Sequence, residues 1–74
     1  PFEALDGKED GLYFYRRIIK ESGTYLKHGG WLAFEIGYDQ AEAVSGLLQE
    51  AGYVKIEVKK DLAGLDRVVY GMYS

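Results

Sequence analysis

Four polar side chains stand where they could bind a ligand or take part in catalysis: Asp10, Glu35, Gln40 and Arg67. Glu35 is the most informative, because it is the one charge in the apolar run 31–36 and lies close to the carboxyl end of a predicted strand. Parallel-sheet enzymes bind ligands at the carboxyl ends of their strands, and a charge in an apolar strand is costly unless it is paired. Glu35 is therefore expected either to line a pocket as a hydrogen-bond acceptor, or to pair with Arg67 or with N–H groups of the following helix.

The other three candidates each have a structural interpretation beside the functional one. Gln40 opens a predicted helix beside the same strand end, where it lines a pocket or is an ordinary first-turn residue. Asp10 is a candidate helix N-cap in a loop that could border a substrate entrance. Arg67, with Asp61 and Asp66, is expected to form an ion-paired turn that locks the last hairpin. The alternative is that this turn contacts a protein partner.

Composition excludes several other kinds of chemistry. The 74 residues contain no cysteine and one histidine, so thiol chemistry is excluded and a metal site is not expected. The net charge is -3 and the nine Lys and Arg residues are scattered, so no nucleic-acid partner is expected. No run approaches the ~20 apolar residues of a membrane span, and the chain is interpreted as cytoplasmic.

Hydrophobic periodicity predicts a helix followed by a buried strand in the first half of the chain. The helix is expected over 12–28, with an apolar stripe of period 3.6, His28 in its last turn and the glycine pair 29–30 as its end. The strand 31–36 is apolar on both faces, which is typical of a parallel strand covered by helices on both sides. Gly37 closes it.

The second half is predicted to contain a helix and a terminal hairpin. Asp39 is the expected N-cap of a helix that stops at Gly52. In the next strand, 54–58, apolar residues alternate with charged ones, which indicates an edge strand whose inner face carries Val54, Ile56 and Val58. A short turn, 61–66, makes the last strand, 67–73, its antiparallel partner.

The predicted order is helix, strand, helix, strand, strand, which makes an incomplete α/β domain of residues 1–74. A chain of this size buries only ~60% of its unfolded surface. The helical crossover makes strands 31–37 and 54–58 parallel. If the last strand inserts between them, the other edge of 31–37 is left unpaired, and self-association through that edge is expected.

Three segments resemble the C-terminal part of the HemK-type protein-glutamine methyltransferases. They are 1–12, spelled PFEALDGKEDGL; the FEIG of 34–37 together with Gln40; and 61–69, spelled DLAGLDRVV. The resemblance covers essentially the whole chain, and the Asp-Leu-Ala-Gly-x-Asp-Arg spelling is its most specific part. The first segment departs from the family at Lys8, where a second glycine is usual.

The resemblance implies the C-terminal half of a class I, Rossmann-like methyltransferase sheet, whose final strand runs antiparallel between two others. It implies methyl transfer from S-adenosylmethionine to the glutamine side-chain amide of a Gly-Gly-Gln motif in peptide-chain release factors. The family's cofactor-binding glycine loop and Asn-Pro-Pro-Tyr motif both precede this segment. No catalytic or cofactor-binding residue is therefore expected in 1–74, and the chain alone is predicted to be inactive. The alternative function is a small α/β regulatory or ligand-binding module that dimerises through its strand edge.

Overall fold

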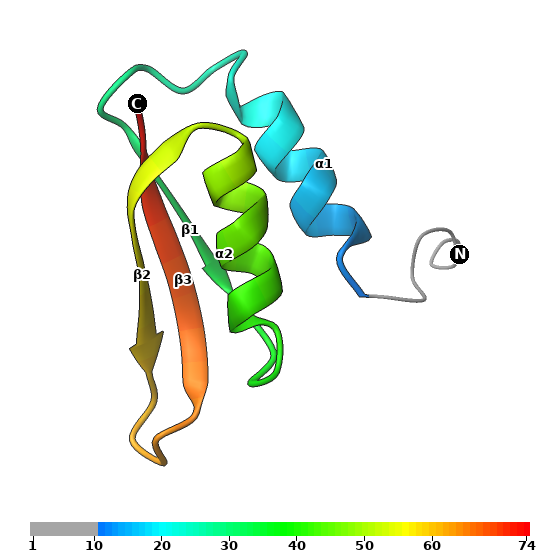
Figure 1. The fold of residues 1–74 in the computed structure, drawn as a ribbon, viewed down its shortest axis with the longest axis vertical. Coiled ribbons are helices and arrows are strands. Elements are labelled where there is room, and N and C mark those ends of the chain that lie inside the picture. The colour runs from blue at the N-terminus through cyan, green and yellow to red at the C-terminus, as the bar shows by residue number, and fades with distance from the viewer. Residues whose placement is uncertain (1–10) are drawn as a thin grey trace.

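The computed structural model describes residues 11–74, so the interpretation of Asp10 as an N-cap lies outside the described residues. The described chain confirms the predicted order of elements (Figure 1). These elements are α1 (Tyr13–Ser22), β1 (Trp31–Glu35), α2 (Ala41–Glu50), β2 (Tyr53–Lys60) and β3 (Asp66–Tyr73).

The three strands form one sheet in the order β1-β3-β2. β3 is antiparallel to both neighbours, so β1 and β2 run parallel to each other, as the helical crossover predicts. The terminal hairpin and the insertion of the last strand between the other two are confirmed. Within residues 11–74 the outer edge of β1 pairs with no strand. Its backbone N–H and C=O groups on that edge are therefore open to another strand.

Both helices lie on one face of the sheet, where α2 packs over β2 and β3 and α1 lies beside α2 (Figure 1). The core lies between them and the sheet. Val44 and Leu48 on α2 are fully buried, and Val69 of β3 is buried beneath them. The remaining buried apolar side chains of the cluster are Ile19, Ile36, Ala41 and Tyr53.

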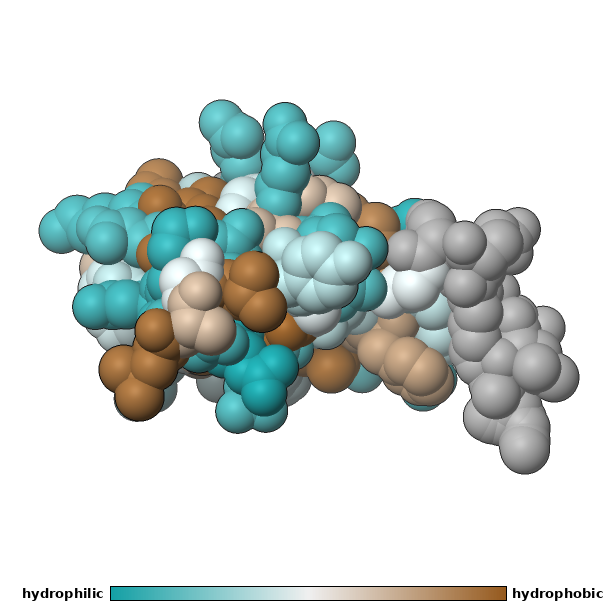
Figure 2. Space-filling view, turned by 90° about the horizontal axis from the view of Figure 1, so that it is seen from below, coloured by the Kyte–Doolittle hydropathy of each residue, from teal (hydrophilic) through white to brown (hydrophobic). Residues whose placement is uncertain are grey.

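The opposite face of the sheet is not covered within the described chain. Trp31 pairs with Met72 and Glu35 with Val68, so these residues share that face. Trp31 is 51% exposed and Glu35 is exposed. The expectation that helices cover this strand on both sides is therefore met on one side only. Seen from below, hydrophobic side chains also reach the surface beside hydrophilic ones (Figure 2).

A β-bulge in β2 overturns the predicted inward position of Val54, whereas Ile56 faces inward as predicted. Lys55 has a positive φ of 55°, and the pairing with β3 shifts between Val54 and Glu57. The extra residue reverses which side chains point inward. Tyr53 and Ile56 therefore face the helices, whereas Val54 pairs with Met72 on the open face and is 41% exposed. Period-two alternation cannot reveal such an insertion.

The first helix ends at Ser22, six residues before the predicted end at 28. Ser22 Oγ donates a 2.7 Å hydrogen bond back to the carbonyl of Ile19, and Thr24 Oγ1 donates to the carbonyl of Glu21 at 2.8 Å. Such local bonds compete with the helical ladder and favour a turn. His28 is thus not a helix-end residue; its Nδ1 lies 2.9 Å from the Ser74 backbone oxygen.

Candidate functional site at the carboxyl end of β1

Polar groups from three segments meet where β1 ends. Gln40 Oε1 accepts a 2.8 Å hydrogen bond from the backbone N–H of Gly37. The Tyr15 hydroxyl lies 3.2 Å from the same Oε1 and 3.1 Å from the carbonyl oxygen of Glu35, so its single hydrogen is donated to one or shared between them. Gln40 Nε2 donates to the carbonyl of Gly11 at 3.3 Å. This cluster joins the start of α1, the end of β1 and the start of α2.

Tyr15 reaches the cluster from α1 because its ring packs against β1. The ring meets Phe34 edge-on, with centroids 5.2 Å apart and an interplanar angle of 84°. Aromatic pairs favour this geometry. Burial raises the pKa of Tyr15 above its usual value, since the charged phenolate is the form that loses hydration. The hydroxyl therefore stays protonated at neutral pH and acts as a donor.

Gln40 occupies the N-cap position of α2, where the sequence pattern predicted Asp39. No side chain caps this helix. The Gln40 side chain turns back to Gly37 and Gly11 instead of bonding the first N–H groups of α2. Gly11 has a φ of +69°, and a Cβ there would stand 3.2 Å from Gln40 Nε2, so both backbone conformation and space favour glycine.

Glu35 does not form the pairs that its structural interpretation predicted. Its carboxylate makes no ion pair or hydrogen bond with any of the described residues, including Arg67 and the N–H groups of α2. Only its backbone oxygen is engaged, by Tyr15. The exposed carboxylate lies on the uncovered face of the sheet, so no desolvation cost arises in residues 11–74. Its role as a pocket acceptor remains a prediction.

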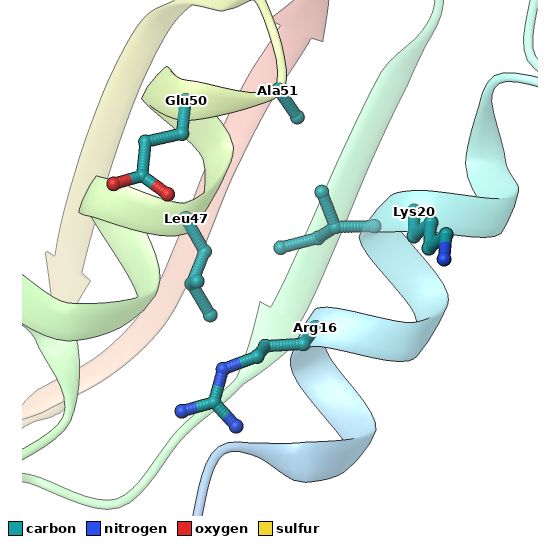
Figure 3. Close-up of a pocket in the computed structure, with 6 residues that line it drawn as sticks. Arg16, Lys20, Leu47, Glu50 and Ala51 are labelled. Atoms are coloured by element: carbon teal, nitrogen blue, oxygen red, sulfur yellow. The ribbon is translucent and has the colours of Figure 1, made fainter.

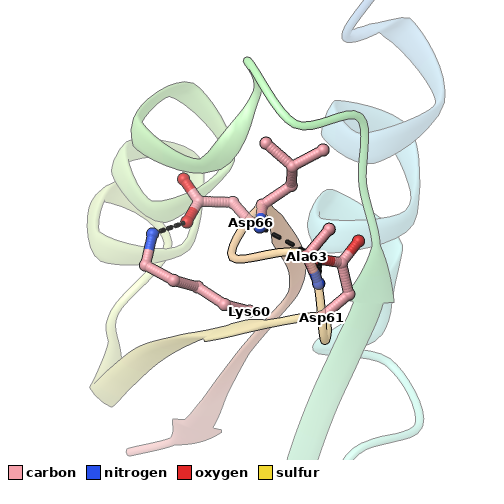
Figure 4. A network of polar contacts seen from close by, with 5 residues as sticks. Lys60, Asp61, Ala63 and Asp66 are labelled. Atoms are coloured by element: carbon pink, nitrogen blue, oxygen red, sulfur yellow. Dashed lines mark hydrogen bonds and ion pairs between the residues drawn. The ribbon is translucent and has the colours of Figure 1, made fainter.

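The hairpin turn is held by Asp61, Asp66 and Lys60, rather than by Arg67 (Figure 4). Asp61 Oδ1 accepts from the N–H groups of Ala63 at 2.9 Å and Leu65 at 3.0 Å. Lys60 Nζ lies 2.7 Å from Asp66 Oδ1. The predicted ion-paired turn is therefore confirmed, but Lys60 takes the place predicted for Arg67.

The remaining two candidates are Arg67, which the structure describes, and Asp10, which it does not. Arg67 contributes its carbonyl to β1, accepting from the Ile36 N–H at 2.9 Å, and its side chain is exposed. This pairing puts Arg67 beside the end of β1. Asp10 lies outside the described residues, and the N-cap position of α1 is occupied by Leu12. The structure thus brings Gln40, Glu35 and Arg67 to one end of the sheet without a hydrogen bond or ion pair among their side chains.

A groove of about 270 Å³ lies elsewhere, between α1 and α2 (Figure 3). Arg16 and Lys20 of α1 and Glu50 of α2 line it, and the Arg16 side chain extends from α1 toward α2. The apolar lining comes from Ile19, Leu47 and Ala51. Glu35, Gln40 and Arg67 do not line this groove, which opens widely to solvent.

Neither a metal-binding group of side chains nor a membrane-spanning helix is found in the described part of the chain. Residues 11–74 contain no group of three or more His, Asp or Glu side chains arranged to hold a metal ion. Neither described helix is long and apolar enough to cross a bilayer.

Sequence comparison decides the relationship that the motifs indicate. The chain is 56% identical over 69 residues to the release factor glutamine methyltransferase of Clostridium botulinum, a match that covers 93% of this chain and 24% of that protein. It is 45% identical over 74 residues to the enzyme of the same name from Vibrio cholerae, covering 100% of this chain and 26% of that one. The chain is a homologue of one part of the release factor glutamine methyltransferases. It spans about a quarter of the length of these curated relatives.

Structural comparison agrees with this relationship. The release factor-specific protein-(glutamine-N5) methyltransferase of Alicyclobacillus acidocaldarius superimposes with a TM-score of 0.69 at 35% identity. The match covers 88% of this chain and 42% of that one. No family model matches the chain. The resemblance to HemK-type enzymes and the methyltransferase fold class are both confirmed.

Sequence reasoning missed Tyr15 as a member of the cluster. Tyr15 falls on the apolar stripe of its helix, so the pattern indicates a core residue and gives no sign of a polar contact. The sequence contains no separate signal for the cluster, because Asp39 offered an ordinary N-cap. Only the structure places Gln40 at the N-cap, a position that glutamine does not favour.

Proposed function

We propose that this chain is part of a protein-glutamine methyltransferase whose substrates are peptide-chain release factors. The observation that carries the proposal is 56% identity to such an enzyme over 93% of the chain. The open outer edge of β1 and the uncovered face beside it support it, because further strands and helices of a larger domain would cover both. Residues 1–74 would then be the C-terminal part of the catalytic domain, acting in the cytoplasm on the translation machinery.

The cofactor of this reaction would be S-adenosylmethionine, which supplies the methyl group that is transferred to the amide nitrogen. The turn between β1 and α2 does not suit it. That turn carries a single glycine, Gly37, and the Gly37 N–H is already bonded to Gln40. Cofactor-binding turns need several glycines and free backbone N–H groups. The described residues of this chain would therefore act on the substrate side.

An amide nitrogen is a poor nucleophile because its lone pair is delocalised, so holding it in the correct orientation is the main contribution that protein residues can make. We assign Glu35, Arg67 and Asp10 to the substrate pocket, and Gln40 to a place beside it, since both ends of its amide are already bonded within the chain. Glu35 is the strongest of these, since its carboxylate has no partner among the described residues and could accept hydrogen bonds from the amide N–H groups of the substrate.

A chimera tests this function directly. In it, this chain replaces the matching 69 residues of the Clostridium botulinum relative. We expect the chimera to methylate purified release factor, whereas the relative without that segment and this chain alone should transfer no methyl group. A folded but inactive chimera would count against the proposal, and activity of this chain alone would contradict its inactivity in isolation.

Self-association of the isolated chain is part of the same proposal. The unpaired edge of β1 and the exposed Trp31 offer apolar surface that a second copy can cover. The alternative of an independent dimerising regulatory module is not favoured, because the relatives reported above are named as methyltransferases.

A further inference from the structure

Gln40 breaks a local rule of helix formation. A Ser, Thr, Asp or Asn at the N-cap would bond an N–H group in the first turn of α2 and stabilise the helix. Gln40 stands there without a capping bond. Proteins depart from such local rules mainly at functional sites, where the side chain serves another purpose. The position therefore gives up helix stability for the contacts that Gln40 makes elsewhere.

Those contacts fix the backbone on both sides of Ile36. Gln40 Oε1 holds the Gly37 N–H at 2.8 Å, and Tyr15 bridges the Glu35 carbonyl and Gln40 Oε1. Ile36 itself is buried and bonded through its N–H to Arg67. The backbone that carries Glu35 is thus held by α1, α2 and β3 together, although the Glu35 side chain is exposed.

The same amide reaches a third segment. Gln40 Nε2 donates to the Gly11 carbonyl, so the chain entering α1 is tied to the end of β1. Both ends of the Gln40 amide are therefore engaged, and neither is left over to bind a substrate directly. This distinguishes Gln40 from Glu35, whose carboxylate is unoccupied by any described residue.

We propose that Tyr15 and Gln40 form a positioning pair, which holds Glu35 and the chain at Gly11 in one arrangement so that the substrate amide is presented in a single orientation. The proposal rests on the proposed function. Tyr15 and Gln40 do not touch the substrate; they act through the backbone of Glu35 and Gly37. A small misplacement of an orienting group is enough to slow a reaction in which orientation is the main source of rate.

The test uses two variants with matched controls. Gln40→Met keeps an unbranched side chain of similar length and removes all three polar contacts; Gln49→Met makes the same change on the exposed side of α2. Tyr15→Phe removes only the hydroxyl, and Tyr25→Phe is its control, since Tyr25 is 63% exposed in the turn that follows α1.

The first measurement is amide hydrogen exchange of the present chain. Gln40→Met should speed exchange of the Gly37 N–H by about fivefold, which corresponds to the loss of one hydrogen bond that contributes about 1 kcal/mol. Tyr15→Phe should have a smaller effect in the same direction. The two control variants should leave Gly37 unchanged. Equal exchange at Gly37 in Gln40→Met and Gln49→Met would overturn the positioning pair, whatever the chimera does.

The second measurement is steady-state kinetics in the chimera described above. We expect kcat with release factor to fall about tenfold in Gln40→Met, while the KM for S-adenosylmethionine stays the same. General loss of structure would change both. An inactive unmodified chimera would overturn the proposed function and this proposal with it. An active chimera in which Gln40→Met and Gln49→Met have the same kcat would overturn the positioning role alone.

Discussion

On one face of the sheet Val69 and Tyr53 are buried beneath the helices, whereas on the other face Trp31 is 51% exposed and Tyr70 and Met72 are only partly buried. Both faces carry large apolar side chains, so they differ in whether helices pack on them more than in their composition. A sheet face of this kind is stable in water only when something packs on it. The comparison shows that residues 11–74 pack both helices on one face of the sheet and leave its other face without a packing layer.

The edges of the sheet differ in the same way. β2 ends the sheet with Lys55, Lys59 and Lys60, charged residues that discourage further pairing. β1 ends it with the apolar sequence WLAFE and no lysine. One edge is therefore a natural boundary of the sheet, and the other is a surface on which the sheet would continue.

The largest effect is expected on the covered face. Leu48 is fully buried, so Leu48→Ala should lower the free energy of unfolding by about 2–5 kcal/mol, since it removes apolar contacts and leaves a cavity. Urea denaturation measures this. Leu62→Ala makes the same chemical change at the fully exposed hairpin tip and should have almost no effect. Equal losses in the two variants would mean that the helix-covered face is not the core.

A smaller loss of stability is expected from a buried polar pair on the covered face, Ser22 and Tyr53. Ser22 Oγ gives its hydrogen to the Ile19 carbonyl, so the Tyr53 hydroxyl, 2.5 Å away, donates to Ser22 Oγ. Tyr53→Phe should cost about 1–2 kcal/mol, because the remaining partner stays buried with one hydrogen bond fewer. Thermal or urea melts would show it. Tyr25→Phe, on an exposed ring, should leave the midpoint where it was.

A substitution on the uncovered face should change self-association of the chain more than its free energy of unfolding. Trp31→Ser removes an exposed ring that meets Tyr70 at 5.7 Å, which should change the free energy of unfolding by only about 0.5 kcal/mol. It should shift sedimentation of the isolated chain toward the monomer. Tyr38→Ser, at a residue that is 68% exposed outside the sheet, is the control. If wild-type chain sediments as a monomer at high concentration, the open face is not an association surface.

The smallest effect is expected in alkaline solution, where Tyr15 links α1 to the end of β1. Burial raises the pKa of Tyr15, so the folded state holds the phenolic proton more tightly than the unfolded state does. This contribution is complete below the unfolded pKa of about 10 and is lost as pH rises through the higher folded value. Tyr15→Phe should therefore lose less stability than wild type across that window. Identical alkaline melts of the two proteins would contradict the assignment.

Much of the candidate site follows from the amino-acid sequence. The apolar run around Glu35 identifies the strand, and the position of Gln40 places it beside the strand end. The partners of these residues do not follow from it. Pairing with Arg67 was one of the alternatives for Glu35, and it does not occur; Gln40 engages Tyr15 and Gly11, residues 25 and 29 positions away in the chain. Contacts at such separations leave no periodic trace in the sequence.

The sequence by itself determined the order of elements, the terminal hairpin and the resemblance to the protein-glutamine methyltransferases, because hydrophobic periodicity, turn residues and motif spelling are local properties of the chain. Only the tertiary structure decided that the bulge at Lys55 turns Val54 outward, that α1 stops at Ser22, and that a single face of the sheet is covered. Each of these depends on which groups find a hydrogen-bond or packing partner from a distant segment. That choice is made by the whole assembled chain and is not encoded in any short stretch of it.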